Sequence, residues 1–310
     1  MLKVFHGINE YREAVSSGEL PGGPSAVTLG KFDGVHLGHQ KLLRQILKRE
    51  DAGLVGIMFA IESKGKKILS ERERAEFASR FGVDVLIECP FSKELMMTSP
   101  EDFVSRILKE SLHASFVTVG TDYRFGFQRA GDAELLTKLG DQYGFSTAII
   151  EKERFEGEEI SSTRTRKAIT DGNMELAASL LGRNYPVWGE VVHGRQLGRT
   201  IGIPTANVLP NPQKILPPDG VYASVTTLPD GRKLGGVTNI GKNPTIADDN
   251  ARNSETYLFD FDEDIYGSFI RTELVCRQRG EMKFSSVKEL SAQMHRDSMA
   301  SRKLLDARIH

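Results

Sequence analysis

The spacing of apolar residues changes near residue 184, and this change limits the possible folds more than any other feature. From Ala26 to about Gly182, short apolar runs alternate with helix-like stretches. From about Tyr185 onward, short segments rich in Val, Tyr, Phe and Thr are separated by Gly, Pro and Asn. A chain of 310 residues rarely forms a single hydrophobic core. We therefore expect two domains, residues 1–184 and residues 185–310.

The first half is predicted to be an α/β domain with a doubly wound parallel sheet. Its apolar runs predict strands at residues 26–29, 54–59, 83–88, 116–119 and 147–150. Helices are expected near Leu37, after Ser70 with Glu73 as a capping box, and after Ser99 with Pro100 in the first turn. Alternating strands and helices form parallel βαβ units. Because ligands bind outside the carboxyl ends of such strands, the turns after residues 29 and 119 are the first candidates for a site.

The second half is predicted to be all-β, followed by one helix. Residues 187–192, 221–226 and 255–261 predict short strands, a pattern typical of an antiparallel barrel or sandwich. Between residues 286 and 305, Leu290, Met294 and Leu304 stand among charged residues. This arrangement predicts a surface helix that packs on the strands.

Composition excludes several classes of protein. The 41 basic and 42 acidic residues nearly balance, which argues against a nucleic-acid-coating protein. No stretch approaches 18 apolar residues, and the N-terminus lacks the pattern of a signal peptide, so we expect no membrane partner. Cys89 and Cys276 are far apart and form no CxxC motif. A reducing cytoplasm is therefore the expected location, while the oligomeric state is left open.

The densest cluster of functional residue types follows the first predicted strand. It contains Gly30, Phe32, Asp33, Gly34, His36, Gly38 and His39. Glycines allow close approach of a ligand to the backbone, and the first N–H groups of a helix attract phosphate. His36 and His39 fall on one face of the first helical turn, where both can donate hydrogen bonds to a phosphoryl group. No third ligand for zinc lies nearby, and no GxGxxG motif is present.

Two further segments combine residue types that suit nucleotides. The first, directly after the strand at 116–119, contains Asp122, Tyr123, Arg124, Phe125 and Gly126. Aromatic rings beside an arginine suit a pocket for a ring and a phosphate, although an ordinary turn explains them equally well. The second segment, at a predicted helix start, contains Ser161, Ser162, Thr163, Arg164 and Arg166. Its hydroxyls and guanidinium groups match a polyphosphate, with a plain N-cap as the alternative.

A glycine-rich segment opens the second half. Gly194, Gly198 and Gly202 precede Pro204, Thr205, Ala206 and Asn207. Backbone N–H groups of such a loop can cradle phosphates, although it is no Walker A motif. Thr205 and Asn207 offer neutral oxygens of the kind that Mg²⁺ accepts, so we predict a magnesium site there. A turn between two strands is the structural alternative.

The three segments of the first half resemble the FAD synthetase family, nucleotidyltransferases with an HxGH motif that are fused to riboflavin kinase. The resemblance implies that His36 and His39 contact the ATP phosphates. It also implies that Ser162, Thr163 and Arg166 hold the β- and γ-phosphates, and that residues 122–126 bind flavin. The reaction would be attack of the FMN phosphate on the α-phosphorus of ATP, with release of pyrophosphate.

The second half resembles riboflavin kinase, whose signature is a glycine-rich loop that ends in Pro-Thr-Ala-Asn. The resemblance implies a β-barrel kinase domain that uses riboflavin and ATP. Asn239-Ile-Gly241 with Pro244-Thr245 is similar to a second family element. Glu255 stands where the family carries its catalytic base, and strand alternation predicts that it shares a face with Tyr257, Phe259 and Phe261.

Two departures from the family pattern leave alternatives open. The family usually has Phe-x-Pro-His-Pro after the second strand, whereas this chain has Phe59-Ala-Ile-Glu62. It also usually has Arg-Asp-Glu near its last helix, whereas this chain has Arg279-Gly-Glu281. Besides a bifunctional enzyme, we therefore consider a riboflavin kinase with weakened adenylyl transfer, and a flavin-binding regulator without catalysis. The phosphate-handling residues of both halves count against the regulator.

Overall fold

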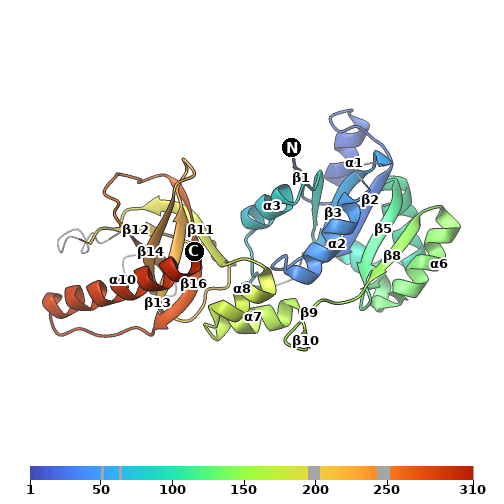
Figure 1. Cartoon of the computed structure of the whole chain (residues 1–310). Coiled ribbons are helices and arrows are strands. Elements are labelled where there is room, and N and C mark those ends of the chain that lie inside the picture. Colours follow the sequence, from blue (N-terminus) through green and yellow to red (C-terminus); the bar gives the residue numbers. More distant parts are fainter. Residues whose placement is uncertain (50–51, 63–64, 195–202, 243–251, 310) are drawn as a thin grey trace. The chain divides into compact units, whose positions relative to one another are not determined.

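A computed structural model of the chain describes residues 1–49, 52–62, 65–194, 203–242 and 252–309 (Figure 1). The chain divides into two compact units. The first contains Met1–Gly65 and Glu71–Ser161, and the second contains Lys66–Ser70 and Ser162–His310. The expected fold classes, α/β and then all-β, are confirmed for the two units. The division of activities near residue 184 stays a prediction.

The first unit is built on a parallel sheet with the order β1-β4-β3-β2-β5-β8. Its strands are β1 (Lys3–Phe5), β2 (Ser25–Gly30), β3 (Val55–Ile61), β4 (Val85–Cys89), β5 (Ala114–Gly120) and β8 (Ser146–Ile150). The central strands are buried on both faces, which explains their nearly continuous apolar sequences. All five predicted strands are confirmed. The short edge strand β1 was not predicted, because three residues are too few to show periodicity.

Helices connect these strands in the alternation that the sequence predicted. They are α1 (Ile8–Ser16), α2 (Leu37–Leu47), α3 (Glu71–Arg80), α4 (Lys93–Met97), α5 (Pro100–Asp102) and α6 (Ala133–Tyr143). Ser99 caps α5 as predicted, because its hydroxyl accepts a hydrogen bond of 3.0 Å from the Asp102 N–H. The chain then continues as a π-helix, η2 (Phe103–Ser111), which helix start signals do not foresee.

The strand order of the first unit reverses between β2 and β5. From β2 the chain moves through β3 to β4 on one side, whereas β5 and β8 lie on the other side. Because both strands are parallel, their carboxyl ends, Gly30 and Gly120, open at the same edge of the sheet. Such a switch point is where doubly wound sheets bind ligands. The two turns singled out from the sequence are therefore neighbours in space.

The second unit is a closed antiparallel barrel with the order β11-β12-β15-β14-β13-β16. The strands are β11 (Tyr185–Val192), β12 (Thr205–Val208), β13 (Gly220–Thr227), β14 (Lys233–Lys242), β15 (Arg252–Leu258) and β16 (Phe269–Arg279). Two helices, α7 (Ser162–Thr170) and α8 (Met174–Leu181), belong to this unit. Inside the barrel, the hydroxyl of Thr238 bonds those of Ser224 and Thr256 at 2.7 and 2.9 Å. The Thr256 side chain on β15 therefore points into the barrel, and the neighbouring Glu255 side chain points to the outer face.

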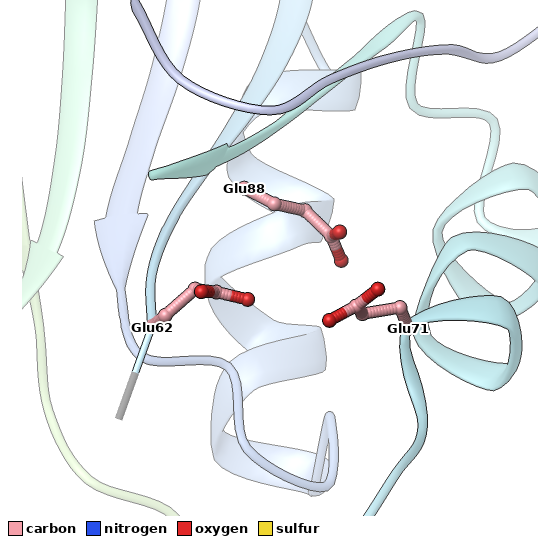
Figure 2. Close-up of side chains that lie close together, drawn as sticks. All are labelled: Glu62, Glu71 and Glu88. Atoms are coloured by element: carbon pink, nitrogen blue, oxygen red, sulfur yellow. The ribbon is translucent and has the colours of Figure 1, made fainter. Parts of the chain in front are cut away.

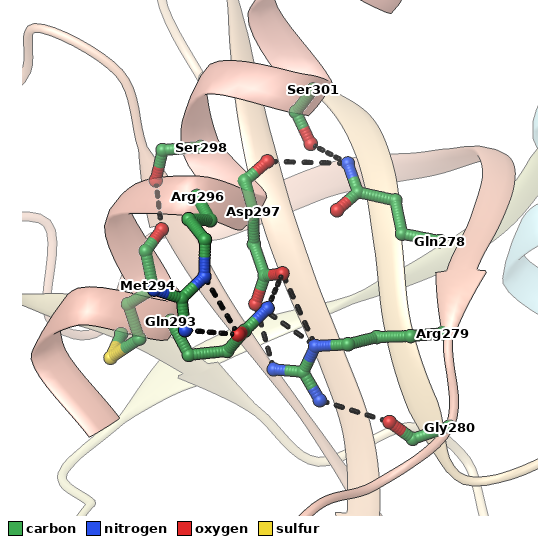
Figure 3. A network of polar contacts seen from close by, with 9 residues as sticks. All are labelled: Gln278, Arg279, Gly280, Gln293, Met294, Arg296, Asp297, Ser298 and Ser301. Atoms are coloured by element: carbon green, nitrogen blue, oxygen red, sulfur yellow. Dashed lines mark hydrogen bonds and ion pairs between the residues drawn. The ribbon is translucent and has the colours of Figure 1, made fainter. Parts of the chain in front are cut away.

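The last helix, α10 (Val287–Ile309), is held on the barrel by a polar network (Figure 3). The Arg279 guanidinium group on β16 donates to both carboxylate oxygens of Asp297, at 2.7–3.2 Å. Gln293 donates to the same carboxylate at 2.8 Å. Arg279 therefore ties the helix to the sheet. No helix in the described part of the chain is long and apolar enough to cross a membrane.

Candidate active sites

The two histidines of the first unit lie at the N-terminus of α2, directly after the switch-point turn. Their rings are stacked, with centroids 3.7 Å apart and planes 16° apart. His36 is the N-cap of α2, because its Nδ1 accepts a hydrogen bond of 3.3 Å from the His39 N–H. An Nδ1 that accepts carries no proton, so the proton of neutral His36 lies on Nε2. The turn thus presents an imidazole donor at the positive end of a helix.

Gly38 leaves room for this stack. A Cβ atom at Gly38 would lie 3.2 Å from the His36 ring, which is too close unless the ring moves. The glycine in the HxGH pattern therefore acts by leaving room for His36, in addition to any approach of a ligand.

The turn before α2 has an unusual backbone. Phe32 and Val35 have φ angles of 48° and 42°, and Gly34 has 89°. Side-chain-bearing residues seldom adopt the left-handed region, and when they do so together they often mark a functional turn. Phe32 is fully buried, and its ring lies 5.0 Å from that of His39. Phe32 therefore supports the histidine pair from inside, and Asp33 is also mostly buried beside it in sequence.

The predicted flavin segment is divided between the core and the surface. The Tyr123 and Phe125 rings stack at 5.7 Å and pack in the core of the unit. Burial raises the pKa of the Tyr123 hydroxyl far above its usual range. Arg124 and Asp122 are exposed, and Asp122 forms an ion pair with Lys152 at 3.1 Å. A Cβ at Gly126 would collide with Pro100. Tyr123 and Gly126 are partly exposed, and Phe125 is buried. A flavin role for this segment stays a prediction.

Carboxylates gather where the family has Pro-His-Pro. Glu62, Glu71 and Glu88 bring their carboxylate oxygens within 4.8 Å of one another and point toward one another (Figure 2). Arg74 lies among them: its Nε donates to Glu88 at 2.8 Å, and its guanidinium group is 3.8 Å from Glu62. Glu88 is buried, Glu62 is partly buried and Glu71 is exposed. Because Arg74 neutralises part of this charge, a partly buried salt-bridge cluster accounts for the arrangement.

The hydroxyl and arginine residues predicted to hold phosphates lie at the start of α7, in the second unit. Ser162 is the first residue of the helix, as expected from the sequence. Thr163 is exposed, whereas Ser162 and Arg166 are half-buried. Arg166 donates a hydrogen bond of 2.6 Å to the Lys66 carbonyl. The start of α7 thus offers hydroxyls and backbone N–H groups, and Arg166 adds a guanidinium group one turn further along the helix.

In the barrel, the two predicted metal ligands are neighbours. The Asn207 amide group donates to the Thr205 carbonyl at 3.3 Å and lies 3.5 Å from the Thr205 hydroxyl. Gly194 lies directly on this pair, since a Cβ there would be 2.6 Å from the Asn207 side chain. Gly198, Gly202, Pro244 and Thr245 lie outside the described residues.

Glu255 belongs to a row of polar residues across three strands. It is paired in register with Asn207 on β12 and with Asn239 on β14. Asn253, two residues earlier on β15, donates to the Glu255 carboxylate at 3.0 Å and lies 3.4 Å from the Asn207 side-chain oxygen. These contacts place the predicted base beside the predicted metal ligands. Neither Asn253 nor Asn239 was singled out as a site residue, although Asn253 stands at the i−2 position from Glu255.

The expectation that Phe261 shares the face of Glu255 is wrong. Strand β15 ends at Leu258, and Asp260 has a φ of 54°, which ends the alternation. Phe261 instead lines a pocket with Asn207 and Tyr266, whereas Phe259 remains packed near Tyr257. The pocket has a volume of about 180 Å³ and is open to solvent.

The other family departure, at Gly280, leaves the neighbouring contacts intact. Glu281 lies against Gly241, where a Cβ would collide with its carboxylate. A Cβ at Gly280 would meet only the Arg277 side chain, at 3.7 Å. Nothing in the packing therefore requires glycine at this position.

Comparisons with known proteins match both halves of the chain. A family model described as FAD synthetase matches residues 22–164, and one described as riboflavin kinase matches residues 181–305. The chain is 37% identical over 313 residues to the bifunctional riboflavin kinase/FMN adenylyltransferase of Escherichia coli (strain K12), covering 97% of both proteins. The protein of the same name from Listeria monocytogenes is 36% identical over 290 residues, covering 89% of this chain and 91% of the relative.

One solved structure is similar over nearly the whole length. The crystal structure of a macrolide-efflux protein from Streptococcus pneumoniae has a TM-score of 0.84 and 31% sequence identity, covering 97% of this chain and 98% of that chain. Identity and coverage at this level, together with the two family models, show that the chain belongs to the family of bifunctional riboflavin kinase/FMN adenylyltransferases.

Proposed function

We propose that the two reactions of this flavin-synthesising enzyme are divided between the sites described above. Residues 185–310 transfer the γ-phosphate of ATP to riboflavin, and residues 1–184 transfer the adenylyl group of ATP to FMN. The observation that supports the first assignment is the row of Asn207, Asn253 and Glu255. The stacked pair of His36 and His39 at the switch point supports the second.

In adenylyl transfer, an FMN phosphate oxygen bonds to the α-phosphorus of ATP as the bond to the β-phosphate oxygen breaks, and pyrophosphate leaves. We assign the Nε2–H of His36 as a donor to the phosphate oxygens, with His39 beside it. Ser162, Thr163 and Arg166 hold the β- and γ-phosphates. Donors placed where charge develops stabilise the transition state without rearranging during the reaction. Residues 122–126 are assigned to the flavin side.

In phosphorylation, Glu255 accepts the proton of the riboflavin 5′-hydroxyl as that oxygen bonds to the γ-phosphorus of ATP. The bond from the γ-phosphorus to the bridging oxygen of the β-phosphate breaks, and ADP leaves. The hydrogen bond from Asn253 orients the carboxylate toward this role. The loop that begins at Gly194 is assigned to the phosphates of ATP. The pocket beside Asn207 is assigned to a ring of one of the substrates.

Enzymes of this family generally require a divalent metal ion, and we propose Mg²⁺ for this chain. The hydroxyl of Thr205 and the amide oxygen of Asn207 are neutral oxygen ligands, and the carboxylate of Glu255 is nearby. This donor set suits a hard cation that also binds phosphate and water. When bound, the ion would neutralise charge on the phosphates of ATP.

The alternative of a kinase with a weakened first domain is not favoured. The histidine stack and its glycine are intact, and a relative that carries both names covers 97% of the chain. The substrates are riboflavin, FMN and ATP. We propose a cytoplasmic location, which both cysteines, free and buried, support.

One incubation tests this assignment. The chain is mixed with riboflavin, ATP and Mg²⁺, and the flavins are separated by chromatography. Both FMN and FAD are expected. FMN alone would contradict adenylyl transfer, and unchanged riboflavin would contradict both activities.

A further inference from the structure

The segment Lys66–Ser70, which we call the strap, is part of the second unit, although its neighbours in sequence, β3 and α3, belong to the first. Its backbone is bound like a short strand. The Lys67 N–H donates to the Gln213 carbonyl at 2.7 Å, and the Ile215 N–H donates to the Lys67 carbonyl at 2.8 Å. These two bonds form a parallel bridge between Lys67 and Lys214. The strap is therefore held by residues almost 150 positions later in the chain.

Two buried side chains also form hydrogen bonds to the strap. The Tyr185 hydroxyl lies 2.9 Å from the Ile68 carbonyl and 2.6 Å from the Ile215 carbonyl, either of which can accept its proton. The Lys214 ammonium group donates to the Ile68 carbonyl at 3.0 Å and lies 4.5 Å from the centre of the Tyr185 ring. Tyr185 and Ile68 are fully buried, and Lys214 is 3% exposed. Hydrogen bonds in such a dry environment are costly to break.

The strap also holds Arg166. The Lys66 carbonyl accepts a hydrogen bond of 2.6 Å from the guanidinium group of Arg166. Arginine has a long side chain with many rotamers, so one fixed N–H limits the directions that the rest of the group can take. Lys66 is the first residue of the strap, so the position of its carbonyl depends on the hydrogen bonds that Tyr185 and Lys214 form with the strap.

We propose that Tyr185 and Lys214, in the half assigned to the kinase, are positioning residues for adenylyl transfer, acting through the strap on Arg166. The inference rests on the proposed role of Arg166 at the β- and γ-phosphates. Groups that touch a substrate work best when their supporting contacts fix them beforehand. Without the hydrogen bonds from Tyr185 and Lys214 to the strap, Arg166 is still present, but its guanidinium group is less well oriented.

The test uses Tyr185→Phe in the full-length chain, because this change removes only the hydroxyl. The KM for ATP in adenylyl transfer to supplied FMN is expected to rise roughly 3- to 10-fold, the effect of one lost hydrogen bond. Riboflavin kinase activity of the same preparation should be unchanged. Tyr185 starts a barrel strand, so a general folding defect would lower kinase activity at least as much. Lys214→Met, which keeps the apolar stem, should show the same selective loss.

Tyr222→Phe is the matched control. Tyr222 is also fully buried in the barrel, and its hydroxyl donates to the Pro218 carbonyl at 2.5 Å, away from the strap. Tyr222→Phe removes the same atom and the same kind of hydrogen bond as Tyr185→Phe. It should leave the KM for ATP in adenylyl transfer unchanged. An equal rise in this control would overturn the inference.

Arg166→Ala separates the inference from the function on which it rests. If Arg166→Ala leaves adenylyl transfer unchanged, the assigned role of Arg166 is wrong, and the inference fails with it. If Arg166→Ala impairs the reaction but Tyr185→Phe and Lys214→Met do not, the inference alone is wrong. If it is right, Tyr185→Phe adds little further loss in the Arg166→Ala background, because both changes act through one group.

Discussion

The two candidate sites differ in the chemistry of their side chains, and this difference matches the nucleophiles of the two reactions as we assign them. In the first unit, imidazoles lie at a helix N-terminus, where donors and a positive dipole are available. In the second unit, the Glu255 carboxylate lies beside the side-chain amides of Asn207 and Asn253 on the outer face of the barrel. The phosphate of FMN is already an anion and needs only charge stabilisation. The hydroxyl of riboflavin must lose a proton, so its site needs a carboxylate as well.

The elements that support the two sites also differ. The histidine turn ends a strand that is buried on both faces, and Phe32 packs beneath it. The Glu255 row stands on strands whose interior is lined with bonded hydroxyls. His39 and Glu255 lie on regular elements and His36 caps one, and such elements hold side chains more precisely than a free loop.

The largest effect is expected from replacing both histidines. His36→Ala combined with His39→Ala removes two donors, each typically worth about 10²–10³-fold. FAD formation from FMN should become undetectable in a standard assay, whereas FMN formation from riboflavin should be nearly intact. Separate assays with FMN and with riboflavin measure the two reactions. Equal loss of both activities in a folded variant would show that the sites are not independent.

The reverse experiment uses Glu255→Gln, which keeps the size and hydrogen bonding of the side chain but cannot accept the proton. The kinase kcat is expected to fall about 10²–10⁴-fold with little change in substrate affinity. Adenylyl transfer to supplied FMN provides the control for folding. A kinase kcat within a few-fold of the unaltered chain would mean that Glu255 is structural, and that the comparison of nucleophiles is wrong.

Gly38→Ala tests whether the stack itself matters. A Cβ at this position would press on the His36 ring at 3.2 Å, so the ring must shift. We expect a roughly tenfold loss of FAD formation, in the manner of a misplaced reactive group. Alanine restricts the unfolded chain more than glycine does, so thermal unfolding should show no loss of stability. Full activity would indicate that the stacked geometry is dispensable.

The smallest effect concerns the metal. Asn207→Asp keeps an oxygen in place but adds a charge beside Glu255. We expect the kinase to need a different Mg²⁺ concentration for half-maximal rate, shifted by a few-fold, because a charged ligand binds a cation more strongly. Adenylyl transfer serves as the comparison in the same titration. Identical titration curves would remove Asn207 from the proposed ligands.

Local sequence patterns determined a large part of this molecule. The five apolar runs of the first half became strands, Ser99 became a cap, and the helix after the histidine turn begins at Leu37. These features depend on residues close together in the chain, which is why spacing reveals them. The motif of His36 and His39 was found in the same way, because both lie in one helical turn.

Only the tertiary structure decided the features that join distant residues. The row of Asn207 and Glu255 depends on the register between two strands, and spacing within one strand does not give that register. Because β15 ends at Leu258, Phe261 lies in the lining of the pocket and not on the face of Glu255. Lys66 and Arg166 are 100 residues apart, and the strap that joins them is held by Tyr185 and Lys214. Such contacts depend on how whole elements pack, and no local preference in the sequence specifies them.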